Sequence, residues 1–249
     1  MHLEIEGQGP DLVLLHGWGL RLEVWDALAG RLRGRWRVIR ADLPGHGRSR
    51  DRTELNAETL IPALETVLAG PAHWIGWSLG GLLALQLSER RPEWFECLGL
   101  VACNPCFAQR PEWPGVTPEV LEAFTAGLKE TPEATWKRFL GLTAQGDNQR
   151  EVLRALRACA GASMPAQAAL AQGLALLAQE DARGAAMRLS APVHWLLGGA
   201  DGLVPAAVAD AVAVLTGPDT VTRIDGAGHA PFLSHSLLFN QWLDACLEA

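Results

Sequence analysis

The sequence lacks a long apolar run, and its start has neither the basic residues nor the apolar stretch of a signal peptide. Its first residues, from Met1 to Glu6, alternate in polarity instead. A membrane-spanning helix needs about 20 apolar residues in succession, and a secretion leader needs a basic segment followed by an apolar one. We therefore expect a soluble protein of the cytoplasm that does not bind membranes.

Cysteine is also scarce: the chain has five, an odd number, at Cys97, Cys103, Cys106, Cys159 and Cys246. Without a secretion signal, such a scattered set does not indicate a disulfide framework. The spacing of Cys103 and Cys106 leaves a redox pair as an alternative. No second pair of ligands follows at the spacing of a zinc site, and we expect thiols without a catalytic role.

Positive charge is in the minority, with 21 Lys and Arg residues against 28 Asp and Glu, a formal net charge of −7 at pH 7. Because nucleic-acid phosphates must be neutralised by a basic surface, we expect no nucleic-acid partner. Apolar residues, by contrast, make up 49% of the chain. Its 249 residues suffice for one large α/β domain or two small ones with a substantial core.

Short apolar stretches recur along the chain and predict the strands of a sheet. Residues 2–6 alternate like an edge strand, whereas 12–15 are continuously apolar, as in a strand buried on both faces. Further strands are predicted at 36–41, 73–75, 98–102, 192–197 and 220–224, and helices at 24–32, 56–68 (with Asn56 as N-cap), 81–90 and 237–247. This alternation indicates an α/β protein with a mostly parallel central sheet flanked by helices.

Residues 105–189 interrupt the alternation. They contain no convincing strand and predict four helices, at 118–128, 131–143, 149–160 and 165–178. Inserted after the strand that ends at Ala102, they would begin at the carboxyl edge of the sheet, where ligands bind. We predict a core of residues 1–104 and 190–249 with 105–189 as a helical cap. The alternative of an independent domain is less favoured, because amphipathic helices need a further surface to bury their apolar faces.

The pentapeptide Gly-Trp-Ser-Leu-Gly, residues 76–80, joins a predicted strand to a predicted helix. A strand that turns at once into a helix strains the residue at the apex, and small flanking residues keep the two elements from colliding. This pattern predicts Ser78 as a nucleophile, with the N–H of Leu79 pointing toward a developing oxyanion. The alternative is a turn serine beside glycines that only allow close packing.

A second loop, His-Gly-Trp-Gly at residues 16–19, follows the buried strand 12–15. Glycine there lets the backbone approach a substrate, so the N–H of Trp18 is the predicted second donor of an oxyanion hole. Asp42 also follows a strand, but Pro44 and two glycines close a tight loop behind it. We interpret Asp42 and His46 as structural residues of that loop.

Asp201 and His229 complete a constellation with Ser78. Each follows a predicted strand, in the chain order nucleophile, acid, histidine. Parallel strands present their carboxyl ends at one edge, so the three should converge there. His229 would be the general base, and Asp201 would fix its tautomer and stabilise the imidazolium. Taken singly, each residue also fits an ordinary loop position.

These segments, at 16–19, 42–49, 76–81 and 228–232, together resemble the α/β-hydrolase superfamily over essentially the whole chain. More specific segments, at 16–20, 23–25, 104–107, 112–115, 138–140 and 201–205, are similar to the BioH-type family of pimeloyl-[acyl-carrier protein] methyl ester esterases of biotin synthesis. The resemblance implies a serine esterase that releases methanol from a carrier-bound pimeloyl methyl ester, and we expect a monomer. We expect no metal or organic cofactor, because the triad itself supplies nucleophile, base and charge stabilisation.

The resemblance also implies site residues. Ser78, Asp201 and His229 would be the catalytic triad, and Trp18 and Leu79 would frame the oxyanion hole. The substrate would contact Trp18, Ser78, Leu79 and His229, with Phe139, Leu140, Gly141, Leu142 and Thr143 of the cap lining the acyl channel. Phe139, Leu140 and Leu142 have a second interpretation as cap core.

An acyl-carrier protein is strongly acidic, so an acidic enzyme would need a local basic face to attract it. Residues 134–160 carry such an excess, in Lys137, Arg138, Arg150, Arg154 and Arg157. The last three recur at steps of four and three, which places them on one face of a helix. The face is either a carrier docking patch or a solvated surface, and Glu151 within it weakens the match.

Other functions share this pattern. A broad short-chain carboxylesterase, a lactonase or a carbon–carbon bond hydrolase would use the same triad and differ in the cap pocket. A protein with a hydrolase fold that binds a ligand without catalysis is a further alternative.

Overall fold

A seven-stranded sheet forms the centre of the protein in the computed structural model, which describes residues 1–52, 54–161 and 163–248. The strand order is β1-β3-β2-β4-β5-β6-β7. The strands are β1 Leu3–Glu6, β2 Asp11–Leu15, β3 Arg37–Ala41, β4 Ala72–Trp77, β5 Phe95–Val101, β6 Val193–Gly198 and β7 Val221–Ile224. Only β1 runs antiparallel to its neighbour, β3, among these strands. The predicted mostly parallel sheet with β1 at an edge is therefore confirmed.

Burial along the strands explains their composition. Every residue of β2 is buried, as a strand covered on both faces requires. The edge strand β1 remains half-buried and alternates in polarity. The central strands β2, β4 and β5 therefore carry most of the apolar core of the sheet.

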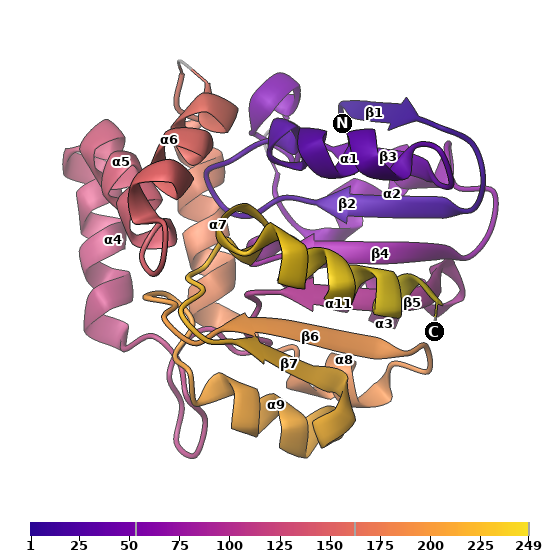
Figure 1. Cartoon of the computed structure of the whole chain (residues 1–249). Coiled ribbons are helices and arrows are strands. Elements are labelled where there is room, and N and C mark those ends of the chain that lie inside the picture. Colours follow the sequence, from indigo (N-terminus) through magenta and orange to yellow (C-terminus); the bar gives the residue numbers. More distant parts are fainter. Residues whose placement is uncertain (53, 162, 249) are drawn as a thin grey trace.

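Helices cover both faces of the sheet. Helices α1 (Asp26–Leu32) and α11 (Ser236–Glu248) lie across the face nearest the viewer in Figure 1, with α11 against β5 and β6. The other face carries α3 (Leu79–Arg90), which packs on β4 and β5 and contacts α2 (Ala57–Glu65) and α8 (Arg183–Arg188). The Asn56 side chain accepts the N–H of Thr59 and caps α2, as predicted.

Four helices of the inserted segment gather beyond the carboxyl ends of the parallel strands (Figure 1). They are α4 (Pro118–Glu130), α5 (Pro132–Thr143), α6 (Gln149–Ala160) and α7 (Gln167–Gln179), and they match the four predicted helices to within a few residues. Proline opens both α4 and α5, where a missing N–H costs nothing. Helix α4 contacts α5 and α7, and α5 contacts α6.

Some elements have no counterpart in the sequence analysis. Helix α9 (Val208–Thr216) has no side-chain cap, and its three valines favour a strand while its three alanines favour a helix, so local preference is mixed. The others are short: α8, α10 (Pro231–Ser234), and the 3₁₀ turns Leu22–Trp25, Gly47–Ser49, Pro92–Trp94 and Pro218–Thr220. Among the described residues, no helix combines the length and the apolar character that crossing a bilayer requires.

The five cysteines are all free. Cys103 and Cys106 are both buried, and burial raises the pKa of each thiol. A redox pair needs a thiol of lowered pKa, so these residues do not form one.

Candidate active site

Ser78 stands at the junction of β4 and α3 with φ 54° and ψ −118°, a conformation that L-residues rarely adopt. Close packing around the junction explains the strain. A methyl group on Gly76 would lie 2.5 Å from the Cα of Gly81, so strand and helix meet backbone to backbone. The structure therefore has the elbow geometry that the pentapeptide predicts.

The loop after β2 lies directly against this elbow. A methyl group on Gly80 would lie 2.6 Å from the carbonyl oxygens of both His16 and Leu15, and one on Gly17 would lie 3.3 Å from the Cβ of Ser78. At Gly80 only glycine fits, because the approach is to backbone atoms, whereas at Gly17 the fit is tight. Residues 16–19 and the elbow, residues 76–81, thus form one packed unit around Ser78, which we call the wall.

Three side chains converge at this wall. The Ser78 hydroxyl lies 2.8 Å from Nε2 of His229, and Nδ1 of the same ring lies 2.8 Å from Oδ2 of Asp201. Because a carboxylate can only accept, Nδ1–H donates to Asp201, and Nε2 is left to accept from the Ser78 hydroxyl. Three residues up to 151 positions apart in the chain are therefore connected nucleophile to base to acid.

The Asp201 carboxylate is held on its other side by the backbone. Its Oδ1 accepts the N–H groups of Leu203 at 2.7 Å and Val204 at 3.0 Å. The side chains of Asp201 and His229 are almost completely buried, at 0% and 1% exposed. Burial removes competing water and strengthens their interaction.

Both predicted oxyanion donors come from segments that adjoin Ser78, since Leu79 directly follows it and the neighbouring loop 16–19 carries Trp18. Leu79 opens helix α3, and the first N–H groups of a helix have no acceptor within it. Trp18 is fully buried in the loop after β2, and its indole Nε1 donates to the carbonyl of Leu170 at 2.8 Å. The indole N–H is therefore already engaged, and a Trp18 donor to an oxyanion would have to be its backbone N–H.

Asp42 has a different task from Asp201. It is fully buried, and its two carboxylate oxygens accept the backbone N–H groups of Leu22 at 2.9 Å and Arg48 at 2.8 Å. The structural interpretation of Asp42 is thus confirmed.

His16 and His46 are also structural. Nε2 of His16 accepts the N–H of Leu43 at 3.0 Å, and Nε2 of His46 accepts that of Gly19 at 3.3 Å. Burial lowers the pKa of His16 to about 4 and that of His46 to about 3. Both rings are therefore neutral supports of the loops around the site.

The inserted helices are tied to the wall by tryptophan. The indole Nε1 of Trp136 donates to the carbonyl of Gly19 at 2.8 Å, and the ring of Phe139 meets that of Trp18 edge-on at 4.5 Å. Thr143, one turn further along α5, is fully buried. Ser78 itself is only 5% exposed beneath this cover.

The five predicted channel residues do not share one face of α5. Phe139 and Thr143 lie about 40° apart around the helix axis, whereas Gly141 lies roughly 200° from Phe139. A methyl group on Gly141 would meet nothing within 4 Å. Leu140 is buried and Leu142 half-buried. Phe139 is thus the predicted channel residue that contacts the wall beside Ser78 through Trp18.

The predicted docking cations are all exposed, on α5 and α6. Lys137 pairs with Glu133 at 2.6 Å, and the guanidinium of Arg138 lies over the Phe124 ring. Arg150, Arg154 and Arg157 form no ion pair with any residue of the described ranges. Val152, Leu156 and Ala160 are the buried residues of α6, so its arginines project outward.

Two features of the site carry no signal in the sequence. The indole Nε1 of Trp77 donates to the backbone carbonyl of His229 at 2.7 Å. In addition, the turn between α5 and α6 packs on the loops that carry Asp201 and His229, where the N–H of Asp147 donates to the carbonyl of Gly226 at 2.8 Å. Local sequence patterns do not encode either contact, because its partners lie far apart in the chain.

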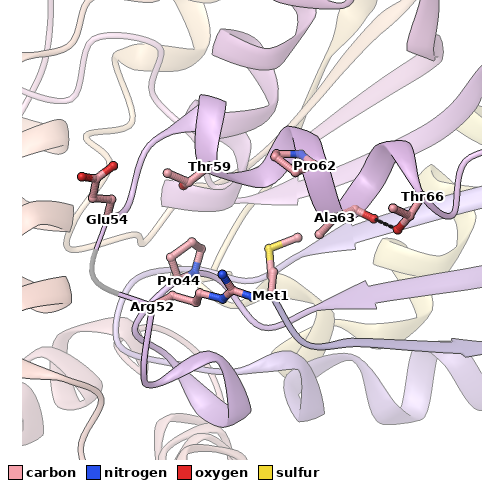
Figure 2. Close-up of a pocket in the computed structure, with 8 residues that line it drawn as sticks. All are labelled: Met1, Pro44, Arg52, Glu54, Thr59, Pro62, Ala63 and Thr66. Atoms are coloured by element: carbon pink, nitrogen blue, oxygen red, sulfur yellow. Dashed lines mark hydrogen bonds between the residues drawn. The ribbon is translucent and has the colours of Figure 1, made fainter.

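A separate groove of about 580 Å³ lies beside α2 and is shown in Figure 2. It is lined by Met1, Pro44, Arg52, Glu54, Thr59, Pro62, Ala63 and Thr66. These lining residues include no histidine that could act as a general base toward a hydroxyl, so they do not form a second catalytic triad. Among the residues that the structure describes, no cluster of His, Cys, Asp and Glu could hold a metal ion.

Comparison with known proteins found a family model and named relatives that match most of the chain. A model of the alpha/beta hydrolase family matches residues 12–242. The pimeloyl-[acyl-carrier protein] methyl ester esterase of Methylococcus capsulatus is 40% identical over 237 residues, 94% of this chain and 93% of that protein. The protein of the same name from Klebsiella pneumoniae is 40% identical over 236 residues, 94% of this chain and 92% of that protein.

Solved structures resemble the chain at lower identity. An esterase from Exiguobacterium antarcticum has a TM-score of 0.87 at 20% identity and covers 100% of this chain and 95% of its own. A bromoperoxidase from Bacillus anthracis has a TM-score of 0.87 at 23% identity, over 99% of this chain and 95% of its own. At these identities the likeness concerns the fold, because one fold hosts many activities.

Proposed function

The chain belongs to the alpha/beta hydrolase family, which confirms the predicted fold class, and we propose that it hydrolyses the methyl ester of pimeloyl-[acyl-carrier protein] in biotin synthesis. The single observation that carries the chemistry is the continuous hydrogen-bonded series from Ser78 through His229 to Asp201, with 2.8 Å at each step. The relatives' shared name supplies the substrate. The chain is accordingly a carboxylic ester hydrolase of the serine type.

In the proposed first half-reaction, the Ser78 oxygen attacks the ester carbonyl while its proton passes to Nε2 of His229. The carbonyl oxygen becomes an oxyanion, which the backbone N–H groups of Trp18 and Leu79 stabilise. Collapse breaks the bond to the methoxy group, and the imidazolium returns the proton to release methanol. An acyl-enzyme on Ser78 remains.

In the second half-reaction, water attacks the acyl-enzyme and gives its proton to His229. Collapse of this second oxyanion breaks the bond to the Ser78 oxygen, which regains the proton, and the distal carboxylic acid leaves and then loses its own proton to solvent. The Asp201 carboxylate stabilises the imidazolium in both halves. The triad therefore supplies nucleophile, base and charge stabilisation from the chain's own residues.

We propose that residues 105–189 act as the cap over this site, on a core of 1–104 and 190–249. The burial of Ser78 and His229 supports this division, because inserted helices α5 and α7 provide the cover through Trp136, Phe139 and Leu170. Phe139 would form the wall of the acyl channel beside Trp18. Gly141 would lie outside that wall, on the opposite side of α5.

We propose that the carrier protein docks on Arg150, Arg154 and Arg157, with Lys137 and Arg138 alongside. The lack of ion-pair partners for these three arginines among the described residues supports this role, since uncompensated cations attract an acidic partner. We further propose a monomer that acts in the cytoplasm. Light scattering after size-exclusion chromatography would measure its mass.

The test compares kcat/KM for pimeloyl-[acyl-carrier protein] methyl ester with that for a small free ester, using Ser78→Ala as the control for both. A strong preference for the carrier-bound ester, abolished in the variant, is the expected result. Comparable turnover of the free ester, also abolished, would mean a general carboxylesterase or lactonase. Failure of the folded wild-type protein to react with a serine-directed fluorophosphonate would mean a binding protein without catalysis.

A further inference from the structure

We propose that the turn joining α5 to α6, residues 144–148, is a positioning element for the catalytic triad. The inference rests on the proposed function, because it assumes that Ser78, His229 and Asp201 act together. It assigns the turn a task that its sequence, Ala-Gln-Gly-Asp-Asn, does not suggest. The turn holds the loop that carries His229, residues 225–230 (the histidine loop), in a fixed position relative to the loop that carries Asp201, residues 199–207 (the acid loop).

The turn is fitted to the histidine loop backbone to backbone. The N–H of Asp147 donates to the carbonyl of Gly226 at 2.8 Å. A methyl group on Gly146 would lie 2.7 Å from that same carbonyl oxygen and 2.8 Å from the nitrogen of Gly228. On Gly228, directly before His229, a methyl group would overlap the carbonyl oxygen of Gln145. Glycine is required on both sides of this contact because no side chain fits between the two segments.

The same turn also contacts the segment that follows His229. The Asn148 amide donates to the carbonyl of Ser234 at 3.2 Å, and Oδ2 of Asp147 lies 3.7 Å from Nε2 of His235. The turn therefore contacts the segment that carries His229 both before and after the catalytic ring.

The acid loop meets the same turn. A methyl group on Gly202, the residue after Asp201, would overlap the side-chain oxygen of Gln145. The turn thus touches the chain directly after the acid and directly before the base. On the opposite side, Trp77 holds the carbonyl of His229 from the elbow. The histidine loop lies between these two supports.

The placement matters because the 2.8 Å contact between His229 and Asp201 depends on the relative position of two loops that are distant in sequence. The loops also meet through the N–H of Ala200, which donates to the carbonyl of Ala227 at 2.9 Å, and the turn supports this pair from outside. A displacement of about 1 Å in a catalytic group can lower turnover on the order of 100-fold. The turn also connects the two helices that carry the proposed docking cations. We expect it to set the turnover number for every ester, carrier-bound or free, rather than the affinity for either.

Gly146→Ala tests this with a matched control. Gly146 has φ +100° and Gly217 has φ +101°, so both positions have a positive φ that strains alanine, but a methyl group on Gly217 would meet nothing within 4 Å. We expect Gly146→Ala to lower kcat for a small free ester roughly 10- to 100-fold, with KM within about twofold. Gly217→Ala should leave kcat unchanged. Equal kcat values in the two folded variants would overturn the inference.

If Gly146→Ala does not fold, the double variant Asp147→Ala/Asn148→Gly replaces it. Both side chains are exposed, and glycine tolerates the left-handed conformation of Asn148, φ 58°. This variant loses the contacts to His235 and Ser234 and should lower kcat roughly three- to tenfold at unchanged KM, with kcat partly restored in Asp147→Asn/Asn148→Gly. Unchanged kcat in the double variant would equally overturn the inference.

The two proposals fail in different ways. Turnover that survives in Ser78→Ala would remove the proposed function, whatever the turn variants do. Turnover that is lost in Ser78→Ala, together with matching kcat values for Gly146→Ala and Gly217→Ala, would remove only the role of the turn.

Discussion

The indole N–H of Trp77 donates to the backbone carbonyl of His229 at 2.7 Å, so the residue before the nucleophile holds the residue that activates it. Trp77 is 1% exposed, and its ring also packs edge-on against Phe232, three residues after His229. The elbow therefore fixes both Ser78 and its base.

Trp77→Phe should remove this hydrogen bond while keeping an aromatic ring in place. A net loss of about 1 kcal/mol in holding His229 corresponds to a roughly fivefold fall in kcat. Trp74→Phe is the matched control. Trp74 is in the same strand, is also 1% exposed and donates to a backbone carbonyl, that of Trp94, at 2.9 Å. Steady-state kinetics that fall equally in both variants would contradict a specific role for Trp77.

Asp201→Asn should leave the fold intact and lower kcat on the order of 10⁴-fold. Asparagine can still accept the N–H groups of Leu203 and Val204, but it no longer enforces the productive tautomer of His229 or stabilises the imidazolium. Asp225→Asn provides the control, because its side chain is 86% exposed and pairs only with Arg223 in the described structure. Activity near wild type in Asp201→Asn, at an unchanged Tm, would contradict the assignment of the acid.

Reversing Arg154 and Arg157 to Glu should lower kcat/KM for carrier-bound substrate about tenfold or more at low salt, through slower association. Turnover of a small free ester should not change. The control reverses Arg33 and Arg35, which are also exposed and give the same change in net charge at the start of β3, the end of the strand away from the inserted helices. Equal losses for carrier-bound and free esters would contradict docking on α6.

Stability should fall as the pH drops from about 6.5 toward 4.5, because His16 and His46 are buried as neutral rings. Burial lowers the pKa of His16 to about 4 and that of His46 to about 3, whereas an unfolded histidine titrates near 6.5. Below pH 6.5 these two histidines bind protons in the unfolded chain but remain unprotonated in the folded chain. Each of the two rings then lowers the free energy of unfolding by up to about 1.4 kcal/mol for each pH unit below 6.5.

Urea unfolding at a series of pH values measures this slope. His46→Gln keeps an acceptor for the N–H of Gly19 without a titrating ring. Its slope between pH 6.5 and 4.5 should be shallower than that of the wild type by up to about 1.4 kcal/mol per pH unit, the share of one buried ring. A slope that does not change would mean that other groups cause the loss.

The sequence by itself determined the features that depend on neighbouring residues. The continuously apolar residues of β2 require burial on both faces, and the glycines around Ser78 allow only a tight strand-to-helix turn. Asn56 three residues before Thr59 is a helix start. The order of Ser78, Asp201 and His229 after parallel strands was enough to predict that they meet, because such strands share one carboxyl edge.

The tertiary structure alone decided how those loops are supported and which side of each helix is used. Trp77 lies 152 positions from His229, and the turn at Gln145 reaches loops more than 50 positions further along. Gly141 and Phe139 are two residues apart yet face opposite ways, and α9 forms from a segment in which alanines and β-branched valines have opposing preferences. Short-range patterns reflect backbone preference and burial, whereas these contacts depend on how complete elements pack against each other.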